Sequence, residues 1–347
     1  MSAGCVGVLL FFAMPCFVWA QSGAAAEAAR GRALAQEGKY DLAIEHYRAA
    51  IKLDPRLPGV HLNLGLAYFK SKRFPEAAAA FEVAVKEDSA SFQARTLLGM
   101  SYYGSAKYAL AARHLKVAAG LDPGNVELRY TLAQSYMWSE QYPEALEEFR
   151  FLLTKNPNSA PVHILLGQAL DAANQVAAAT AEFEAAVKAS PRHPDVHFGL
   201  GYLYWKQQRY EEASREFEAE LAGQPQHAQA LTYLGDSEMR LGKEESAEGR
   251  LRQALKLAPE SRLAHLDLGI LLARKNESAE AVRHFREAIR LDPSKPDARY
   301  RLGRLLSSMG REDEARAEFD RVKKLAAEEP PPPLIRLPGR SSSAPAP

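Results

Sequence analysis

Residues 61–85 read HLNLGLAYFKSKRFPEAAAAFEVAV, a helix-like stretch that places small residues at apolar positions. Gly65 follows Leu64, and Ala77 stands four residues before Phe81. A glycine inside a helix costs about 0.5–1 kcal/mol relative to alanine. A compensating contact is therefore expected at Gly65, and the close approach of a second helix would supply it.

The same arrangement returns every 34 residues along the chain. The residues at the place of Gly65 are Gly31, Gly99, Ala133, Gly167, Gly201, Gly235, Gly269 and Gly303. A fixed period of this length indicates one repeat architecture, although a length of 347 residues alone would suggest two or three domains. Nine repeats fit from residue 24 without insertion or deletion. Their ranges are 24–57, 58–91, 92–125, 126–159, 160–193, 194–227, 228–261, 262–295 and 296–329.

Each repeat carries the pattern of two amphipathic helices. Position 7 of the repeat is Leu in eight cases, position 8 is Gly in eight, position 20 is Ala in all nine, and position 24 is always bulky. Positions 4, 7, 8 and 11 share one face of a first helix, and positions 20, 24 and 27 share one face of a second helix. We expect Gly at position 8 and Ala at position 20 to bring the two helices together, with the large residues at positions 7 and 24 filling the space around them.

Prolines mark both ends of the second helix. Pro at position 32, present in seven repeats, stops this helix, and Pro75 and Pro143 at position 18 suit its start. Each helical hairpin leaves its apolar face half covered, and stacking of neighbouring hairpins would cover the remainder. The sequence therefore predicts an all-α fold, an α-α solenoid in which each repeat contacts its neighbours.

This pattern resembles the tetratricopeptide repeat family over 306 of the 347 residues. The resemblance implies a right-handed superhelix of helix pairs, a concave groove lined by the first helices, and binding of other proteins without catalysis. The sequence departs from the family pattern at position 4, which is commonly Trp in the family. It also departs at two positions of the apolar helix faces, where glutamate replaces an apolar residue. These residues are His61, His163, His197 and His265 at position 4, Glu220 at position 27 and Glu238 at position 11.

The two terminal repeats also differ from the others. Arg30 occupies position 7 in the first repeat, as a terminal repeat facing water would allow. The ninth repeat lacks the closing proline, so we expect its second helix to end the stack and to expose a polar face.

Composition excludes several classes of function. The 44 Lys and Arg residues nearly balance the 43 Asp and Glu residues, so no global charge recruits nucleic acid or an anionic membrane. Residues 249–311 hold 14 basic against 7 acidic residues, which we interpret as solvated helix faces and not as a polyanion site. Both cysteines, Cys5 and Cys16, precede the repeats, so the repeats have no disulfide, Cys-based zinc site or thiol nucleophile.

The N-terminal sequence predicts that the protein is exported. Residues 5–20, CVGVLLFFAMPCFVWA, form an uncharged run of 16 residues. As a helix this run would span about 24 Å, which is less than the bilayer core of about 30 Å. We therefore predict a secretory signal peptide, residues 1–20, cut after Ala20, with a periplasmic or secreted product. The start MSAG lacks Lys and Arg, which leaves an uncleaved membrane anchor formed by residues 5–20 as the alternative.

The C-terminal tail, residues 330–347, reads PPPPLIRLPGRSSSAPAP and cannot build a packed core. Such a composition predicts an extended or disordered segment. A linker-like end is the favoured interpretation, and a docking peptide is the alternative.

We find no residues arranged for catalysis, and we expect no catalytic site, no cofactor and no metal. The sequence has no Gly-rich phosphate loop after a strand and no His-Glu-x-x-His motif. His193 and His197 have the four-residue spacing of a helical metal pair, but Pro194 places His193 in the turn before the helix. The four histidines at position 4 recur by register, which favours a shared structural role over separate ligand roles.

Positions 5, 9 and 12 of the first helix form a row beside the core stripe. In the resembled family this row faces the groove. The expected partner-binding residues are Leu62, Leu66, Phe69, Met100, Tyr103, Tyr130, Met137, Trp138, Phe198, Tyr202 and Trp205. Their apolar and aromatic character is typical of interface cores. In the alternative interpretation, the same residues complete the packing between repeats.

The sequence thus predicts an exported, non-enzymatic scaffold that holds a peptide or helix of a protein partner in its concave groove. One alternative is a regulatory or substrate-presenting subunit of an enzyme complex for envelope assembly or glycan export, which rests on analogy. Another alternative is a self-assembling structural array, in which the chain forms a homo-oligomer. We expect no nucleic-acid partner, and a membrane association only through an uncleaved N-terminal anchor.

Overall fold

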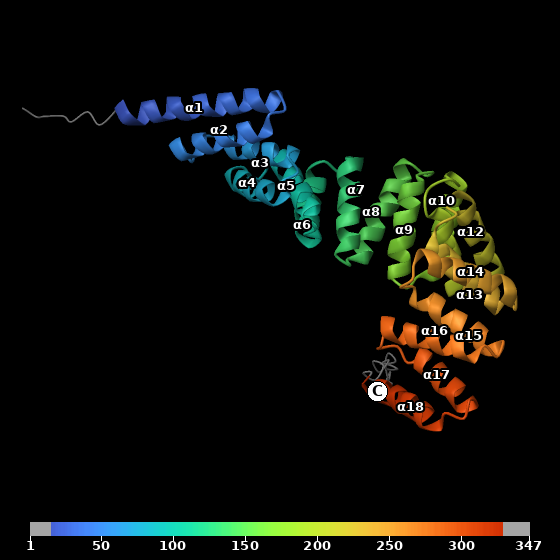
Figure 1. Ribbon diagram of the computed structural model, residues 1–347. Coiled ribbons are helices and arrows are strands. Elements are labelled where there is room, and N and C mark those ends of the chain that lie inside the picture. Colours follow the sequence, from blue (N-terminus) through green and yellow to red (C-terminus); the bar gives the residue numbers. More distant parts are fainter. Residues whose placement is uncertain (1–14, 329–347) are drawn as a thin grey trace, which may run out of the picture. The chain divides into compact units, whose positions relative to one another are not determined.

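The computed structural model describes residues 15–328, and side chains from residue 23 onward. Within that range every regular element is an α-helix, and the helices follow one another as helix-turn-helix pairs (Figure 1). The predicted all-α fold of paired helices is confirmed. The predictions for residues 1–14 of the signal peptide and for the tail, residues 330–347, lie outside the described residues.

The chain divides into two compact bodies, Met1–Ser190 and Pro191–Pro347, and the division falls near the end of the fifth repeat. The helices of the N-terminal body are α1 (Pro15–Gln36), α2 (Tyr40–Leu53), α3 (Val60–Lys70), α4 (Phe74–Glu87), α5 (Phe92–Gly104), α6 (Tyr108–Leu121), α7 (Val126–Trp138), α8 (Tyr142–Lys155), α9 (Ala160–Ala172) and α10 (Val176–Ala189). The helices of the C-terminal body are α11 (Val196–Lys206), α12 (Tyr210–Gly223), α13 (Ala228–Arg240), α14 (Glu244–Leu257), α15 (Arg262–Arg274), α16 (Ser278–Leu291), α17 (Asp297–Ser308) and α18 (Glu312–Glu328).

Helix α1 continues through Ala20, the predicted cleavage point, into the first repeat. The described helices include none with the length and apolar character that a membrane span requires.

The glycine at position 8 lies directly against the large residue at position 24. A Cβ added to Gly65 would come within 2.6 Å of the Phe81 ring, and one added to Gly99 within 2.5 Å of Leu115. The expected close approach of the two helices is therefore confirmed. One detail differs from the prediction, because the position-24 side chain occupies the place of the missing glycine side chain and does not merely fill space around it.

The turn between the two helices of each repeat has a left-handed residue at position 15. These residues, with φ between 56° and 77°, are Gly38, Lys72, Ala106, Glu140, Asn174, Gln208, Gly242, Asn276 and Gly310. Only three of them are glycine, so residue type alone does not reveal this turn.

Within each body, the second helix of a repeat packs between its own first helix and the first helix of the next repeat. First helices of successive repeats also contact one another, as α3 contacts α5 and α13 contacts α15. The first helices of a body therefore lie side by side and form one face, which we call the first-helix face. Helix α18 is longer than the other second helices, with 17 residues against 14, as expected without the closing proline.

Candidate functional site

Four aromatic side chains gather on the first-helix face of the C-terminal body. Phe198, Tyr202 and Trp205 come from α11, and Tyr233 comes from α13 of the next repeat. The Tyr233 ring centroid lies 5.4 Å from that of Tyr202, 5.0 Å from that of Trp205 and 6.1 Å from that of Phe198. All four side chains are half-buried, so they join two repeats and still present surface to solvent.

The Trp205 indole is held by a specific hydrogen bond. Its Nε1–H donates to Oδ2 of Asp236 at 2.5 Å, and Asp236 is fully buried. Arg240 donates to the other Asp236 oxygen at 3.3 Å. A side chain fixed in this way loses little conformational freedom when a partner binds, which favours a docking role.

The N-terminal body carries a second aromatic group on its first-helix face. The Tyr103 ring lies 5.5 Å from the Tyr108 ring, which in turn lies 6.3 Å from the Trp138 ring. Trp138 is 54% exposed and Met137 is 7% exposed, so Trp138 offers far more surface for docking. Tyr108 begins a second helix and was missed by the sequence pattern, which considered first helices alone.

The other expected docking residues of the N-terminal body lie on α3, α5 and α7. All of them are half-buried, and they are Leu62, Leu66, Phe69, Met100 and Tyr130. Phe69 packs edge-on against Phe74 with a centroid distance of 5.5 Å, so it contributes to packing within its own repeat.

Two of the four histidines at position 4, His163 and His197, share one structural role, as their register predicts. His163 Nδ1 lies 2.6 Å from Oε2 of Glu182 at position 23, and Nε2 lies 2.9 Å from the carbonyl oxygen of Pro157 in the preceding repeat. His197 makes the same two contacts with Glu216 and Pro191. We call this arrangement the position-4 bridge, since it ties the start of a first helix to the second helix and to the turn before it.

Arginine forms the same bridge in the fourth repeat. Arg129 donates to the Pro123 carbonyl oxygen at 2.7 Å and to Oε2 of Glu148 at 2.6 Å. His61 departs from the pattern, because its Nε2 lies 3.9 Å from Glu87.

The eighth repeat has a different bridge, in which two histidines meet. Nδ1 of His265 lies 2.8 Å from Nδ1 of His284, which replaces the glutamate at position 23. Burial, then the neighbouring His265, lowers the pKa of His284 below its usual range. Two protonated rings would repel at this distance, so the pair favours at least one neutral ring.

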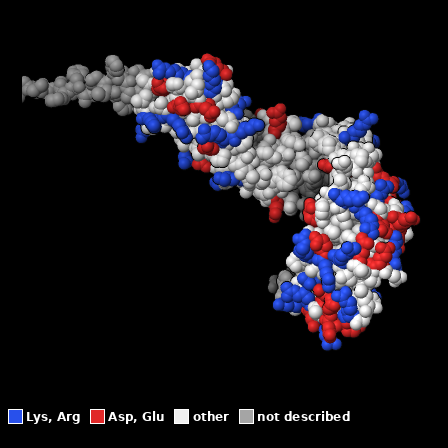
Figure 2. Space-filling model, viewed as in Figure 1, with Lys and Arg blue, Asp and Glu red and all other residues white. Residues whose placement is uncertain are grey.

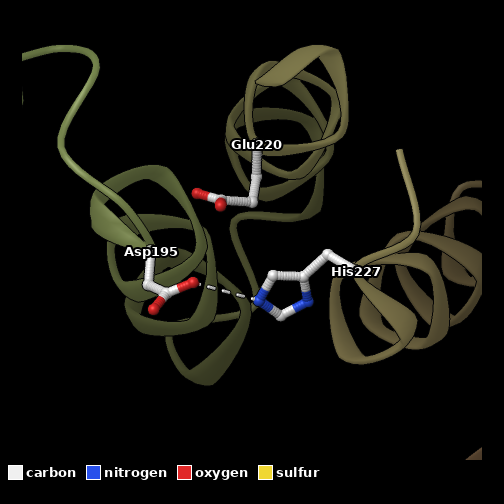
Figure 3. Close-up of side chains that lie close together, drawn as sticks. All are labelled: Asp195, Glu220 and His227. Atoms are coloured by element: carbon white, nitrogen blue, oxygen red, sulfur yellow. Dashed lines mark ion pairs between the residues drawn. The ribbon is translucent and has the colours of Figure 1, made fainter. Parts of the chain in front are cut away.

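Asp195, Glu220 and His227 bring three groups of metal-ligating type together in the sixth repeat (Figure 3). One ligand atom from each residue lies within 4.8 Å of the others. Oδ1 of Asp195 lies 3.4 Å from Nε2 of His227. The sequence spacing did not identify this group, since its members come from two turns and the end of α12.

The hydrogen bonds in this group serve the starts of two helices. Glu220 is 4% exposed, and its Oε2 accepts the backbone N–H of Phe198 in the first turn of α11 at 3.0 Å. Nδ1 of His227 accepts the backbone N–H of Ala230 in the first turn of α13 at 3.1 Å. Both contacts satisfy N–H groups that have no partner inside a helix. This capping role explains why an acid stands at position 27, where the other repeats carry apolar residues.

The same contacts oppose a metal at His227. Because Nδ1 accepts a hydrogen bond, the neutral ring carries its hydrogen on Nε2, the atom that faces Asp195. A metal bound at Nε2 would have to replace that hydrogen while Nδ1 kept its acceptor role. Glu220 Oε1 also accepts a hydrogen bond from Gln224 at 2.6 Å. We therefore interpret the group as a capping network.

Three models of the tetratricopeptide repeat match the chain. One described as TPR repeat matches residues 31–72, and two described as tetratricopeptide repeat match residues 164–228, 198–262 and 233–296, and residues 102–169 and 272–331. No curated protein matches the chain significantly.

Solved structures with the same fold are only distantly related in sequence. The C-terminal part of a TPR repeat-containing protein from Cytophaga hutchinsonii has a TM-score of 0.56 at 15% identity, over 67% of this chain and 96% of that one. The APC/C hetero-tetramer Cut9–Hcn1 has a TM-score of 0.53 at 16% identity, over 77% of this chain and 52% of that one. YrrB, described as a TPR protein with an unusual peptide-binding site, has a TM-score of 0.43 at 22% identity, over 52% of this chain and 93% of that one.

The family models and the first two of these structures agree with the repeats and the paired helices described above. The likeness to the first two structures supports the fold. The chain belongs to the tetratricopeptide repeat family, whose members are protein-interaction scaffolds.

Proposed function

We propose that this chain is an exported, non-enzymatic scaffold whose first-helix face holds a peptide or helix of another protein. Export rests on the uncharged run of residues 5–20, and the docking role rests on the aromatic side chains of the first-helix face. A regulatory subunit and a self-assembling array are the competing possibilities.

The observation that carries the docking proposal is the partial exposure of rigid aromatic side chains. Trp138 is 54% exposed, although burying an indole from water is strongly favourable. Tyr202 and Trp205 are half-buried and are held by the neighbouring Tyr233 and by Asp236. Aromatic anchors of this kind contribute most of the binding energy at protein interfaces.

Alanine substitutions test the docking role. Biotinylated protein should capture a partner from an extract of the source cells, and Trp138→Ala and Tyr202→Ala should each weaken capture by about fivefold or more, equivalent to about 1 kcal/mol. Trp138→Ala should change the free energy of unfolding by less than about 0.5 kcal/mol, because this side chain is mostly exposed.

Leu200→Ala is the matched control for Tyr202→Ala, since both residues lie on α11. Leu200 is 3% exposed, and its truncation should cost about 2–5 kcal/mol through lost burial and a cavity. If Tyr202→Ala costs as much stability as Leu200→Ala and leaves capture unchanged, Tyr202 serves only to pack repeats and the docking proposal fails there. Capture of a single enzyme in fixed proportion would favour the regulatory-subunit alternative, and capture of the chain itself would favour self-assembly.

A further inference from the structure

Two histidine nitrogens converge between the helices of the eighth repeat. Nδ1 of His265 on α15 lies 2.8 Å from Nδ1 of His284 on α16. In the bridges of His163 and His197 the same ring nitrogen faces a glutamate oxygen at 2.6 Å instead. Neutral imidazole nitrogen is the commonest metal ligand in proteins, so the eighth repeat brings two atoms of metal-ligating type together.

The other nitrogen of each ring faces a hydrogen-bond acceptor. Nε2 of His265 lies 2.9 Å from the carbonyl oxygen of Pro259, so Nε2 carries the hydrogen and Nδ1 of the neutral ring has a lone pair. Nε2 of His284 lies 3.7 Å from Oε1 of Glu280. Histidines that bind a metal through one ring nitrogen usually donate the N–H of the other to a carbonyl or a carboxylate. Both rings are oriented in this way.

A neutral His284 cannot satisfy both of its neighbours with one hydrogen. A hydrogen on Nδ1 donates to His265 and leaves the Nε2 lone pair toward the Glu280 carboxylate. A hydrogen on Nε2 leaves two Nδ1 lone pairs facing each other. Burial, then the neighbouring His265, lowers the pKa of His284, which disfavours a second hydrogen on this ring. A metal ion between the two Nδ1 atoms would satisfy both lone pairs and keep the Nε2 hydrogen for Glu280.

The spacing of the two nitrogens suits a tetrahedral zinc ion. Zinc binds imidazole nitrogen at about 2.0–2.1 Å, so two such ligands lie about 3.3 Å apart. The Nδ1 atoms of His265 and His284, now 2.8 Å apart, would separate by about 0.5 Å, which small rotations of the two rings supply. The side chain of His284 is 16% exposed, so an ion can reach the pair from solvent.

The charges around the pair do not exclude a cation. Arg252 on α14 acts on His284, but it donates to Glu280 at 2.9 Å and to Glu248 at 2.8 Å, so its charge is balanced. Figure 2 shows acidic and basic side chains interspersed over the C-terminal helices. The nitrogen ligands, and not a general negative surface, would therefore select the ion.

A carboxylate stands near the pair on the same helix. Glu287 follows His284 by three residues on α16, which places the two side chains on one side of the helix. Arg290, then the nearby His265, lowers the pKa of Glu287. Arg290 donates to Glu287 at 2.9 Å and is 66% exposed, and exposed ion pairs of this kind contribute little to stability. Glu287 can therefore leave Arg290 and supply a third ligand.

We propose that Nδ1 of His265 and Nδ1 of His284 bind a zinc ion, with Glu287 and water as the remaining ligands, and that this ion ties α15 to α16. This goes beyond the proposed function, because it adds a metal site to a repeat that contains neither Trp138 nor Tyr202. The sequence predicts no metal, since the two histidines stand 19 residues apart and meet only when the helices pack.

Zinc titration tests the proposal. The full chain, without a polyhistidine tag and with Cys5→Ser and Cys16→Ser so that no thiol binds zinc, should be freed of metal with EDTA and titrated with zinc sulfate against a chromogenic chelator. We expect one zinc ion per chain at pH 7.5. Binding should be at least about tenfold weaker at pH 5.5, because protons compete with the metal for histidine nitrogen. Magnesium should not compete, since it prefers oxygen ligands.

Variants assign the zinc to the histidine pair. His265→Gln and His284→Gln should each weaken binding at least about tenfold, since even the partners of a metal ligand are worth about 10–100-fold. His163→Gln is the matched control, because His163 holds the same position of the repeat with its Nδ1 on Glu182. This control should bind zinc as the wild type does, and so should His227→Gln, which removes the histidine of the capping network. Circular dichroism in EDTA should show that every variant folds.

X-ray absorption at the zinc edge makes the test independent of the variants. The chain with one equivalent of zinc should show two imidazole ligands at about 2.0–2.1 Å and oxygen ligands beside them.

Three results would overturn the proposal. Zinc could fail to bind at micromolar concentrations, or it could bind His284→Gln and His163→Gln equally. Alternatively, His227→Gln alone could abolish binding, which would move the ion to the capping network. None of these outcomes touches the capture experiment with Trp138→Ala and Tyr202→Ala, so the two proposals can fail independently.

Discussion

The ring of Phe217 lies where a side chain on Gly201 would have to go. A Cβ added to Gly201 would come within 2.8 Å of that ring, which is fully buried. We predict that Gly201→Ala destabilises the C-terminal body by about 1–3 kcal/mol, as overpacking of a core does. Hydrogen exchange in α11 and α12 would measure this change locally.

Gly249→Ala is the control for this prediction. Gly249 lies inside α14, and nothing stands within 4 Å of an added Cβ. The same substitution there should stabilise the helix by about 0.5–1 kcal/mol, since alanine favours helix more than glycine does. Equal effects at Gly201 and Gly249 would show that the ring contact is unimportant.

Position 15 of the repeat gives a second prediction. Ala106 has φ of 56°, a left-handed conformation that disfavours residues with a Cβ. Ala106→Gly should therefore stabilise its repeat by about 0.5–1 kcal/mol, and Gly242→Ala at the same position of the seventh repeat should have the opposite effect. Urea melts would measure both, and a loss of stability in Ala106→Gly would contradict the prediction.

The histidine pair of the eighth repeat predicts a dependence on pH. The pKa of His284 is lowered from 6.5 in the folded chain, so the unfolded chain binds more protons below about pH 6.5. The free energy of unfolding should consequently fall as the pH decreases through this range. His284→Glu would remove the group with the lowered pKa and would place at position 23 the glutamate that stands in the bridge of His163 and Glu182.

The measurement is the urea midpoint at pH 7.5 and at pH 5.5 for the wild type and for His284→Glu. The wild type should lose more stability on acidification than the variant does. Equal losses in both proteins would show that the pair does not govern this dependence.

Export provides a fourth prediction. We expect the mature chain to begin at Gln21 and to occur in a periplasmic or extracellular fraction. Intact-mass spectrometry of the protein from its source would measure the N-terminus directly. Retention of residues 1–20 in a membrane fraction would instead support the uncleaved anchor.

The features that recur at the repeat period could be predicted from the sequence. Leu64, Gly65 and Phe81 stand in fixed register, so the paired helices and the contact at the glycine follow from spacing alone. The shared role of His163 and His197 follows in the same way, because equivalent positions meet equivalent neighbours.

Features that depend on one repeat could not be predicted from the period. Tyr233 joins Trp205 across two repeats, and Glu220 caps a helix that starts 24 residues before the acid itself, at Val196. The left-handed turn at position 15 accepts Lys, Glu and Gln as well as Gly, so the residue types at this position do not indicate a left-handed conformation.

Photo-crosslinking tests the central claim, that the first-helix face holds another protein, most directly. A benzoylphenylalanine placed at Trp138 or Tyr202 samples that face, and one placed at Arg113 or Arg215 samples exposed positions on the second helices α6 and α12. We predict that irradiation of the source cells gives covalent adducts with a partner protein from positions 138 and 202 and none from positions 113 and 215. Adducts that form only from Arg113 and Arg215 would contradict it.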